Sequence, residues 1–180
     1  MKYFLLPLGC QMNQSDTERV KTILQSMGFM PTENEDEATI LGIIACSVRQ
    51  KGIDKVYSRI MKWNEMKNRK NCITFVSGCI LPADRERFLK LFDLVFTMND
   101  LPDLPDMIRQ YGIVIPTSQQ PTANSQQPIV NIQRPLVPLF NKKDKINPSA
   151  NMDRFWIIEP DHISEFEAFI PIQNGCNKFC

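Results

Sequence analysis

Short apolar runs alternate with amphipathic stretches over the first 112 residues of the chain. Apolar runs of strand length occur at residues 2–8, 39–45, 72–77 and 94–97, with a weaker run at 29–32. Between these runs, apolar residues recur every three or four positions, which is the period of a helix with one buried face. Alternating strands and helices are typical of a parallel sheet covered by helices. The pattern therefore predicts an α/β fold with an open, mainly parallel sheet and flanking helices, a Rossmann-like domain.

Local signals indicate where the helices begin. The segments "SDTE" at residues 15–18 and "SVRQ" at 47–50 both match the capping box, in which a Ser side chain and a Glu or Gln side chain bond the free N–H groups of the first turn. Pro82 suits the first turn of a third helix. A fourth helix is expected at residues 103–111.

The composition changes after residue 112. The stretch "PTSQQPTANSQQPIVNIQRP" is rich in Pro, Gln, Ser and Asn and has few residues that could form a core. Beyond it, "RFWIIE" and "FEAFIPIQ" regain strand character. We therefore expect a sheet domain at residues 1–112, a linker at 113–153 and the start of a second structural unit at 154–180.

Charge and hydropathy narrow the class of protein. The chain has 180 residues, 43% of them hydrophobic, and a formal net charge of +1, so it lacks the basic excess that would by itself predict nucleic-acid binding. No apolar run approaches the roughly 18 residues that a membrane-spanning helix requires. We therefore expect a cytoplasmic protein without a membrane partner.

Three of the six cysteines occupy equivalent places in the pattern. Cys10, Cys46 and Cys79 each follow a predicted strand, and each comes directly after a small residue. The carboxyl ends of parallel strands share one edge of an open sheet, and ligands bind in the crevice there. We therefore predict that these three thiols meet at one edge, where Met12 and Asn13 could line the crevice.

The number of thiols indicates the chemistry of the predicted site. A structural zinc site usually has four protein ligands, whereas a [4Fe–4S] cluster held by three thiolates keeps one iron open. A non-enzymatic domain, in which the three cysteines bind zinc or sense redox state, remains an alternative. Cys72 begins the strand that Cys79 follows, about 20 Å away at ~3.3 Å per residue, so we interpret it as a buried structural residue.

Two further features are interpreted as solvent-exposed loops. The sequence has a single histidine, His162, which lies in the acidic stretch "EPDHISEFE". The other feature is the acidic run "ENEDEA" at residues 33–38. With one histidine, hydrolytic triads and His-rich zinc sites have little support.

The segments "LGCQMNQSDTERV", "CSVRQK", "VSGC" and "FIPIQNGCNKFC" together resemble the methylthiotransferases. These are radical S-adenosylmethionine enzymes that attach a methylthio group to tRNA or to a ribosomal protein. The resemblance covers essentially the entire chain. It implies that residues 1–112 are the family's auxiliary-cluster domain and that residues 154–180 begin a radical barrel, which is truncated because the third cysteine of the C-x-x-x-C-x-x-C signature would come after Cys180.

The resemblance also implies cofactors, partners and site residues. Cys10, Cys46 and Cys79 would bind an auxiliary [4Fe–4S] cluster, and Cys176 and Cys180 would be two of three ligands of the cluster that binds S-adenosylmethionine. Within the family, "GCQMN" and "CSVRQK" look most like the branch that methylthiolates C2 of isopentenylated adenosine in the anticodon stem-loop of tRNA. Branches acting on threonylcarbamoyl adenosine or on a ribosomal protein are the alternatives. This chain alone would be inactive.

Overall fold

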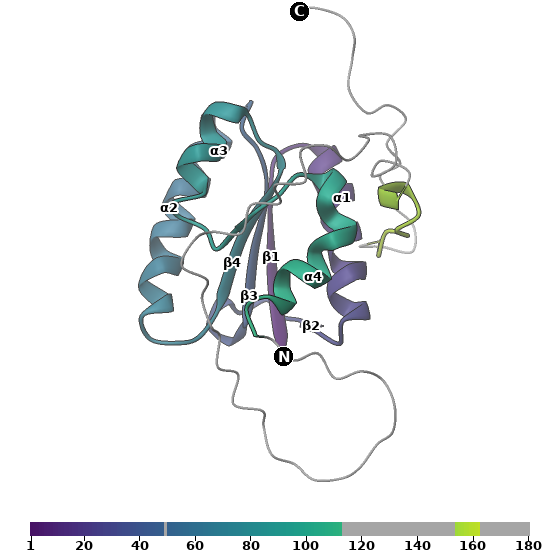
Figure 1. The fold of residues 1–180 in the computed structure, drawn as a ribbon. Coiled ribbons are helices and arrows are strands. Elements are labelled where there is room, and N and C mark those ends of the chain that lie inside the picture. The colour runs from purple at the N-terminus through teal and green to yellow at the C-terminus, as the bar shows by residue number, and fades with distance from the viewer. Residues whose placement is uncertain (49, 113–153, 163–180) are drawn as a thin grey trace, which may run out of the picture.

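The computed structural model describes residues 1–48, 50–112 and 154–162 of the chain. Over these residues it forms a five-stranded, all-parallel sheet with strand order β2-β1-β3-β4-β5 and helices on both faces (Figure 1). The predicted α/β, Rossmann-like class is therefore confirmed. The elements are β1 (Lys2–Leu8), α1 (Gln11–Ser26), β2 (Met30–Pro31), η1 (Glu35–Glu37), β3 (Ile40–Cys46), α2 (Gln50–Lys67), β4 (Ile73–Cys79), α3 (Pro82–Phe88), β5 (Leu94–Val95), η2 (Met98–Asp103) and α4 (Leu104–Arg109).

Two apolar clusters hold the helices on opposite faces of the sheet. Helices α1 and α4 cover one face and α2 and α3 cover the other, as Figure 1 shows. The α2 side is built on the residues that the helical period predicts, which are Ile53, Val56, Ile60 and Trp63. Strand β3 is buried along its whole length, which explains its continuous apolar sequence.

The register of the sheet aligns the strand ends. Strand β1 pairs with β3 from Tyr3 opposite Ile40 to Leu8 opposite Ala45. Strand β2 pairs with β1 only at Lys2 and Tyr3. Within the described residues, the outer edge of β1 beyond Tyr3 therefore has no partner strand.

Two helices begin elsewhere than predicted. Helix α1 starts at Gln11, with Cys10 as its N-cap, so the predicted capping box at residues 15–18 is wrong. The Asn13 side chain accepts a hydrogen bond from the Cys10 N–H and supplies the reciprocal half of a capping box five residues earlier. Helix α2 starts at Gln50 rather than beside Ser47, whose hydroxyl is bonded to the end of β4 instead.

The predicted strand at "RFWIIE" is also wrong. Residues 154–156 are helical, and the segment 154–162 packs against α1. Phe155 is 2% exposed in the α1 core, and the Arg19 guanidinium lies 5.1 Å from the centroid of its ring. Burial of one aromatic ring against α1 therefore outweighs local strand preference. The predicted linker and the second strand of this unit lie outside the described residues.

Both acidic loops are exposed at most of their described residues, as predicted, but each is held to a helix by a buried carboxylate. Glu35 is 8% exposed, and its two carboxylate oxygens lie 2.6 Å from Arg59 Nη1 and 2.8 Å from Lys62 Nζ. His162 Nδ1 lies 3.2 Å from Oε2 of the buried Glu18. These residues therefore hold the loops against α2 and α1.

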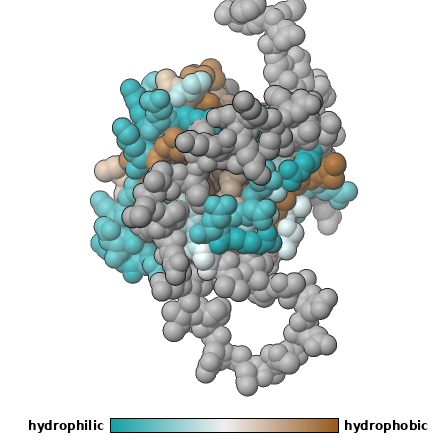
Figure 2. Space-filling view, viewed as in Figure 1, coloured by the Kyte–Doolittle hydropathy of each residue, from teal (hydrophilic) through white to brown (hydrophobic). Residues whose placement is uncertain are grey.

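Figure 2 shows mainly hydrophilic residues over the outer side of α2, opposite the face that packs on the sheet. Across the described parts of the chain, no helix combines the length and the apolar character needed to cross a membrane.

Candidate functional site

Cys46 and Cys79 end two neighbouring parallel strands at the same level. They are Cα partners in the register of β3 and β4, as are Ala45 and Gly78 one step earlier. Ser47 also connects the ends of β3 and β4, because its N–H and its hydroxyl both donate to the carbonyl oxygen of Cys79, at 2.9 and 3.1 Å. Two of the predicted thiols are therefore fixed side by side at the carboxyl edge of the sheet.

Asn13 brings the third cysteine to this edge. Its Oδ1 accepts a hydrogen bond from the Cys10 N–H at 3.1 Å, and its Nδ2 donates to the carbonyl oxygen of Ala45 at 3.3 Å. The Cys10 thiol lies 3.6 Å from the same Oδ1. Asn13 is fully buried, so a buried amide spans from the first turn of α1 to the end of β3.

Two glycines leave room for this amide. A Cβ at Gly9 would overlap the Asn13 side chain, and a Cβ at Gly78 would overlap the carbonyl oxygen of Ala45. Gly78 also has φ +108°, a backbone conformation that L residues rarely adopt. The small residue before two of the three cysteines is therefore required by the close approach of the backbone at this edge.

Cys46 and Cys10 lie close enough to Cys79 to affect the ionisation of its thiol. The pKa of Cys79 is raised, first by burial and then by the negative charges of Cys46, Asp16 and Cys10. A cation bound among them would offset both the burial and the repulsion, because metals bind the thiolate form. The thiols also differ in exposure: Cys46 is buried, Cys10 is half-buried and Cys79 is exposed, so the edge is open to a ligand.

Asp16 is a further acidic group beside this edge. It is 2% exposed, burial raises its pKa to about 6, and the nearby Arg19 opposes that shift. One carboxylate oxygen, Oδ1, has no hydrogen-bond partner among the described residues. The predicted capping box at residues 15–18 places Asp16 in the first turn of a helix, which does not indicate that its side chain is buried beside the cysteines.

Cys72 lies apart from the site. It is 0% exposed within the apolar cluster beneath α2, just before the first residue of β4. This position, at the opposite end of the strand from Cys79, agrees with the structural role predicted for it. Cys176 and Cys180 lie outside the described residues.

A [4Fe–4S] cluster, the group that the resemblance implies, requires a different arrangement of thiols from a single metal ion. Among the residues described, no three His, Cys, Asp or Glu side chains are placed to bind a single metal ion. One ion would require sulfur atoms about 2.3 Å from a common centre, whereas the three thiolates of a [4Fe–4S] cluster bind three different irons and stand further apart. Three thiols on one open edge, with small residues beside them, provide the type of donor atom that a three-thiolate [4Fe–4S] cluster requires.

Ser47 also has a role that its sequence pattern did not predict. It was expected to cap α2, yet its hydroxyl accepts a hydrogen bond from the Leu81 N–H at 2.6 Å and donates to Cys79. Its position directly after Cys46, at the end of β3, was the one feature of the sequence that could have indicated this role. Asn13, in contrast, lies in the crevice region as predicted.

The chain matches one family model, and the relatives described below all carry the same name. Residues 2–98 match the model of a family described as "Uncharacterized protein family UPF0004". Over 98% to 100% of its length the chain is similar to three proteins named tRNA-2-methylthio-N(6)-dimethylallyladenosine synthase: 32% identical to that of Petrotoga mobilis, 30% to that of Geobacter metallireducens and 28% to that of Dictyoglomus thermophilum.

The chain spans 35% to 36% of the length of these relatives. The residues matched by the family model include Cys10, Cys46 and Cys79 and the whole sheet edge that carries them. The chain therefore belongs to the UPF0004 family.

Proposed function

We propose that this chain is the part of a tRNA methylthiotransferase that binds an auxiliary [4Fe–4S] cluster through Cys10, Cys46 and Cys79. The observation that carries the proposal is the position of these three residues, which are far apart in sequence and lie on one edge of the sheet. Three thiolates leave one iron without a protein ligand. That vacancy distinguishes a site that takes part in chemistry from a purely structural site.

Each neighbouring residue has a defined task in this proposal. Asn13 orients the first turn of α1 relative to β3, and Ser47 holds the ends of β3 and β4 together. Gly78 lets the backbone pass close to Ala45. When bound, the cluster would supply the sulfur that becomes the methylthio group, and these residues determine where its protein ligands stand.

The activity of the whole enzyme is part of the proposal. The relatives are named for 2-methylthio-N(6)-dimethylallyladenosine in tRNA, and we propose the same substrate class, the anticodon stem-loop of tRNA, in the cytoplasm. Cys176 and Cys180 would be two of the ligands of a second [4Fe–4S] cluster, at which S-adenosylmethionine binds. The chain spans 35% to 36% of the length of these relatives, so this activity is proposed for the whole enzyme.

Anaerobic reconstitution with iron and sulfide tests the auxiliary site. The protein with Cys176 and Cys180 changed to Ala isolates this site from the second one, and we expect it to bind close to four irons with broad visible absorbance. Changing Cys10, Cys46 and Cys79 to Ala in addition should abolish that absorbance. Cys72→Ala is the matched control and should leave the absorbance intact. A colourless protein that binds zinc through the same three thiols would refute the proposal.

A second measurement tests the substrate. Nucleosides from tRNA of cells with and without the complete gene can be compared by mass spectrometry. Loss of the 2-methylthio derivative of isopentenyladenosine is expected in its absence. Loss of a threonylcarbamoyl derivative instead would assign the protein to another branch of the family.

A further inference from the structure

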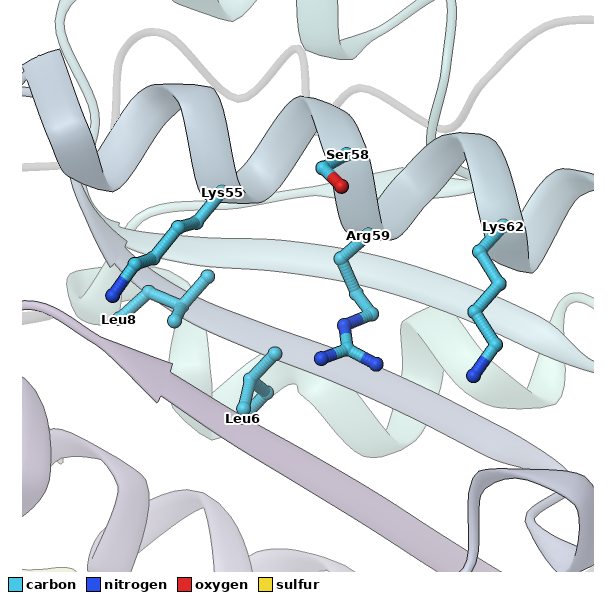
Figure 3. Close-up of a pocket in the computed structure, with 6 residues that line it drawn as sticks. All are labelled: Leu6, Leu8, Lys55, Ser58, Arg59 and Lys62. Atoms are coloured by element: carbon cyan, nitrogen blue, oxygen red, sulfur yellow. The ribbon is translucent and has the colours of Figure 1, made fainter.

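A groove runs between β1 and α2 and ends beside the cysteine edge. It has a volume of about 510 Å³ and is lined by Leu6, Leu8, Lys55, Ser58, Arg59 and Lys62 (Figure 3). An adjoining hollow of about 500 Å³ shares Leu8 and Lys55 and continues through Lys51 to Gly9, the residue before Cys10. The groove is open because β1 has no partner strand here among the described residues.

The helical wall of the groove is basic. Lys51, Lys55, Arg59 and Lys62 lie on one side of α2 at spacings of four, four and three residues. Figure 3 shows three of these side chains reaching from α2 towards β1. At 1.5 Å per residue, successive groups stand about 6 Å apart along the helix, which is comparable to the step between phosphates of a nucleic-acid strand.

The positive charge is compensated at one end of the groove only. Arg59 and Lys62 both pair with Glu35, and the acidic residues Glu33 and Asp36 line a hollow at that end. Lys51 and Lys55 are exposed and make no ion pair with any described residue. The uncompensated charge therefore lies at the end of the groove that adjoins the cysteine edge.

The opposite wall of the groove is apolar. Leu6 and Leu8 are half-buried on the α2 face of β1 and belong to its apolar cluster. A basic wall facing an apolar wall suits a single nucleic-acid strand, whose phosphates meet the cations while sugars and bases cover the apolar residues. An acidic peptide would meet the same charges but would leave the leucines without a matching surface.

We infer that Lys51 and Lys55 bind backbone phosphates of the RNA substrate and lead the strand to the cysteine edge. The inference rests on the proposed function for the identity of the partner, and it adds a binding surface on this domain. It also explains how a chain with a net charge of +1 can contact RNA. The charge is local, and the net value does not report it.

Fluorescence anisotropy of a fluorescein-labelled RNA stem-loop, titrated with the 180-residue chain, tests the inference. A double variant, with Lys51→Glu and Lys55→Glu, should bind this RNA at least tenfold more weakly at low salt. The slope of log K against log salt between about 50 and 200 mM should fall in magnitude by roughly 1.4, because each lost single-strand phosphate contact contributes about 0.7. The control, Lys21→Glu with Arg109→Glu, makes the same change of charge on helices of the opposite face.

Three results would overturn the inference: unchanged affinity in the Lys51 and Lys55 variant, an equal loss in the control, or competition by polyglutamate as strong as that by unlabelled RNA. Iron loading of each variant is measured in parallel. If iron loading is normal and RNA binding does not depend on the lysines, only this inference fails. If the lysines are required for RNA binding and the thiols bind no iron, only the proposed cluster fails.

Discussion

Gly78→Ala tests whether the close backbone approach at the sheet edge is needed for stability and for the site. Gly78 has φ +108°, and an added Cβ would lie closer than 3.0 Å to the carbonyl oxygen of Ala45, a backbone atom that cannot turn away. The matched control is Gly28→Ala, because Gly28 also has a positive φ, +82°, and an added Cβ there meets nothing within 4 Å.

Both substitutions place a side chain at a positive φ, but only Gly78→Ala also creates a steric overlap. A positive φ costs a non-glycine residue about 1 to 2 kcal/mol, which applies to both variants. Overpacking against fixed neighbours adds roughly 1 to 3 kcal/mol, and this applies to Gly78 alone. We therefore expect Gly78→Ala to lower the free energy of unfolding by about 2 kcal/mol more than Gly28→Ala does.

Urea unfolding followed by circular dichroism measures this difference. With a slope near 2 kcal/mol per M, the unfolding midpoint of Gly78→Ala should lie about 1 M below that of Gly28→Ala. The displaced strand end should also reduce iron incorporation in Gly78→Ala and leave it normal in Gly28→Ala. Equal midpoints for the two variants would show that the edge is not tightly packed and would refute the reasoning.

Three further substitutions address neighbouring groups. Asn13→Ala should destabilise the fold by about 1 to 3 kcal/mol, because the buried Ala45 carbonyl loses its donor, and should lower iron loading; unchanged loading in a folded variant would contradict the role of Asn13. Asp16→Asn should remove a pH dependence of stability: the pKa of Asp16 is raised from 3.8 to about 6, so the native chain binds more protons in that window and the free energy of unfolding falls by at most roughly 3 kcal/mol as pH rises through it. Urea titrations at several pH values should show this fall in the unsubstituted protein and a smaller one in the variant. Cys72→Ala should lower the free energy of unfolding by about 1 kcal/mol and leave the visible spectrum of the reconstituted protein unchanged. Loss of the visible absorbance in this variant would place the Cys72 thiol in the site.

Strand positions were predictable because burial on both faces requires continuous apolar runs. The predicted strand at residues 39–45 corresponds to β3 within one residue, and that at 2–8 corresponds to β1. Helix starts were not predictable from local signals alone. Ser15 and Ser47 both match a capping motif, yet their side chains are used otherwise: the Ser15 hydroxyl accepts a hydrogen bond from Arg19 one turn further along α1, and the Ser47 hydroxyl donates to the Cys79 carbonyl oxygen, 32 positions away.

Some residues of the candidate site were predictable from the sequence and others were not. The cysteines could be predicted from the chain because each one follows a strand, and the carboxyl ends of parallel strands share one edge. The strand order that makes β1, β3 and β4 neighbours came from the structure. Ser47 and Asp16 could not, because their roles depend on contacts with residues distant in sequence. The same holds for Glu35, whose carboxylate meets Arg59 and Lys62 across 24 and 27 positions.

The amino-acid sequence by itself determined the parallel α/β class and the three thiols at strand ends, since both follow from the period of apolar residues and from positions relative to it. Only the tertiary structure decided that Asn13 ties Cys10 to β3, that residues 154–162 pack on α1 and that lysines of α2 face an open strand edge. The physical reason is that these features are contacts between segments distant along the chain. Local propensity carries no information about which distant partner a side chain will meet.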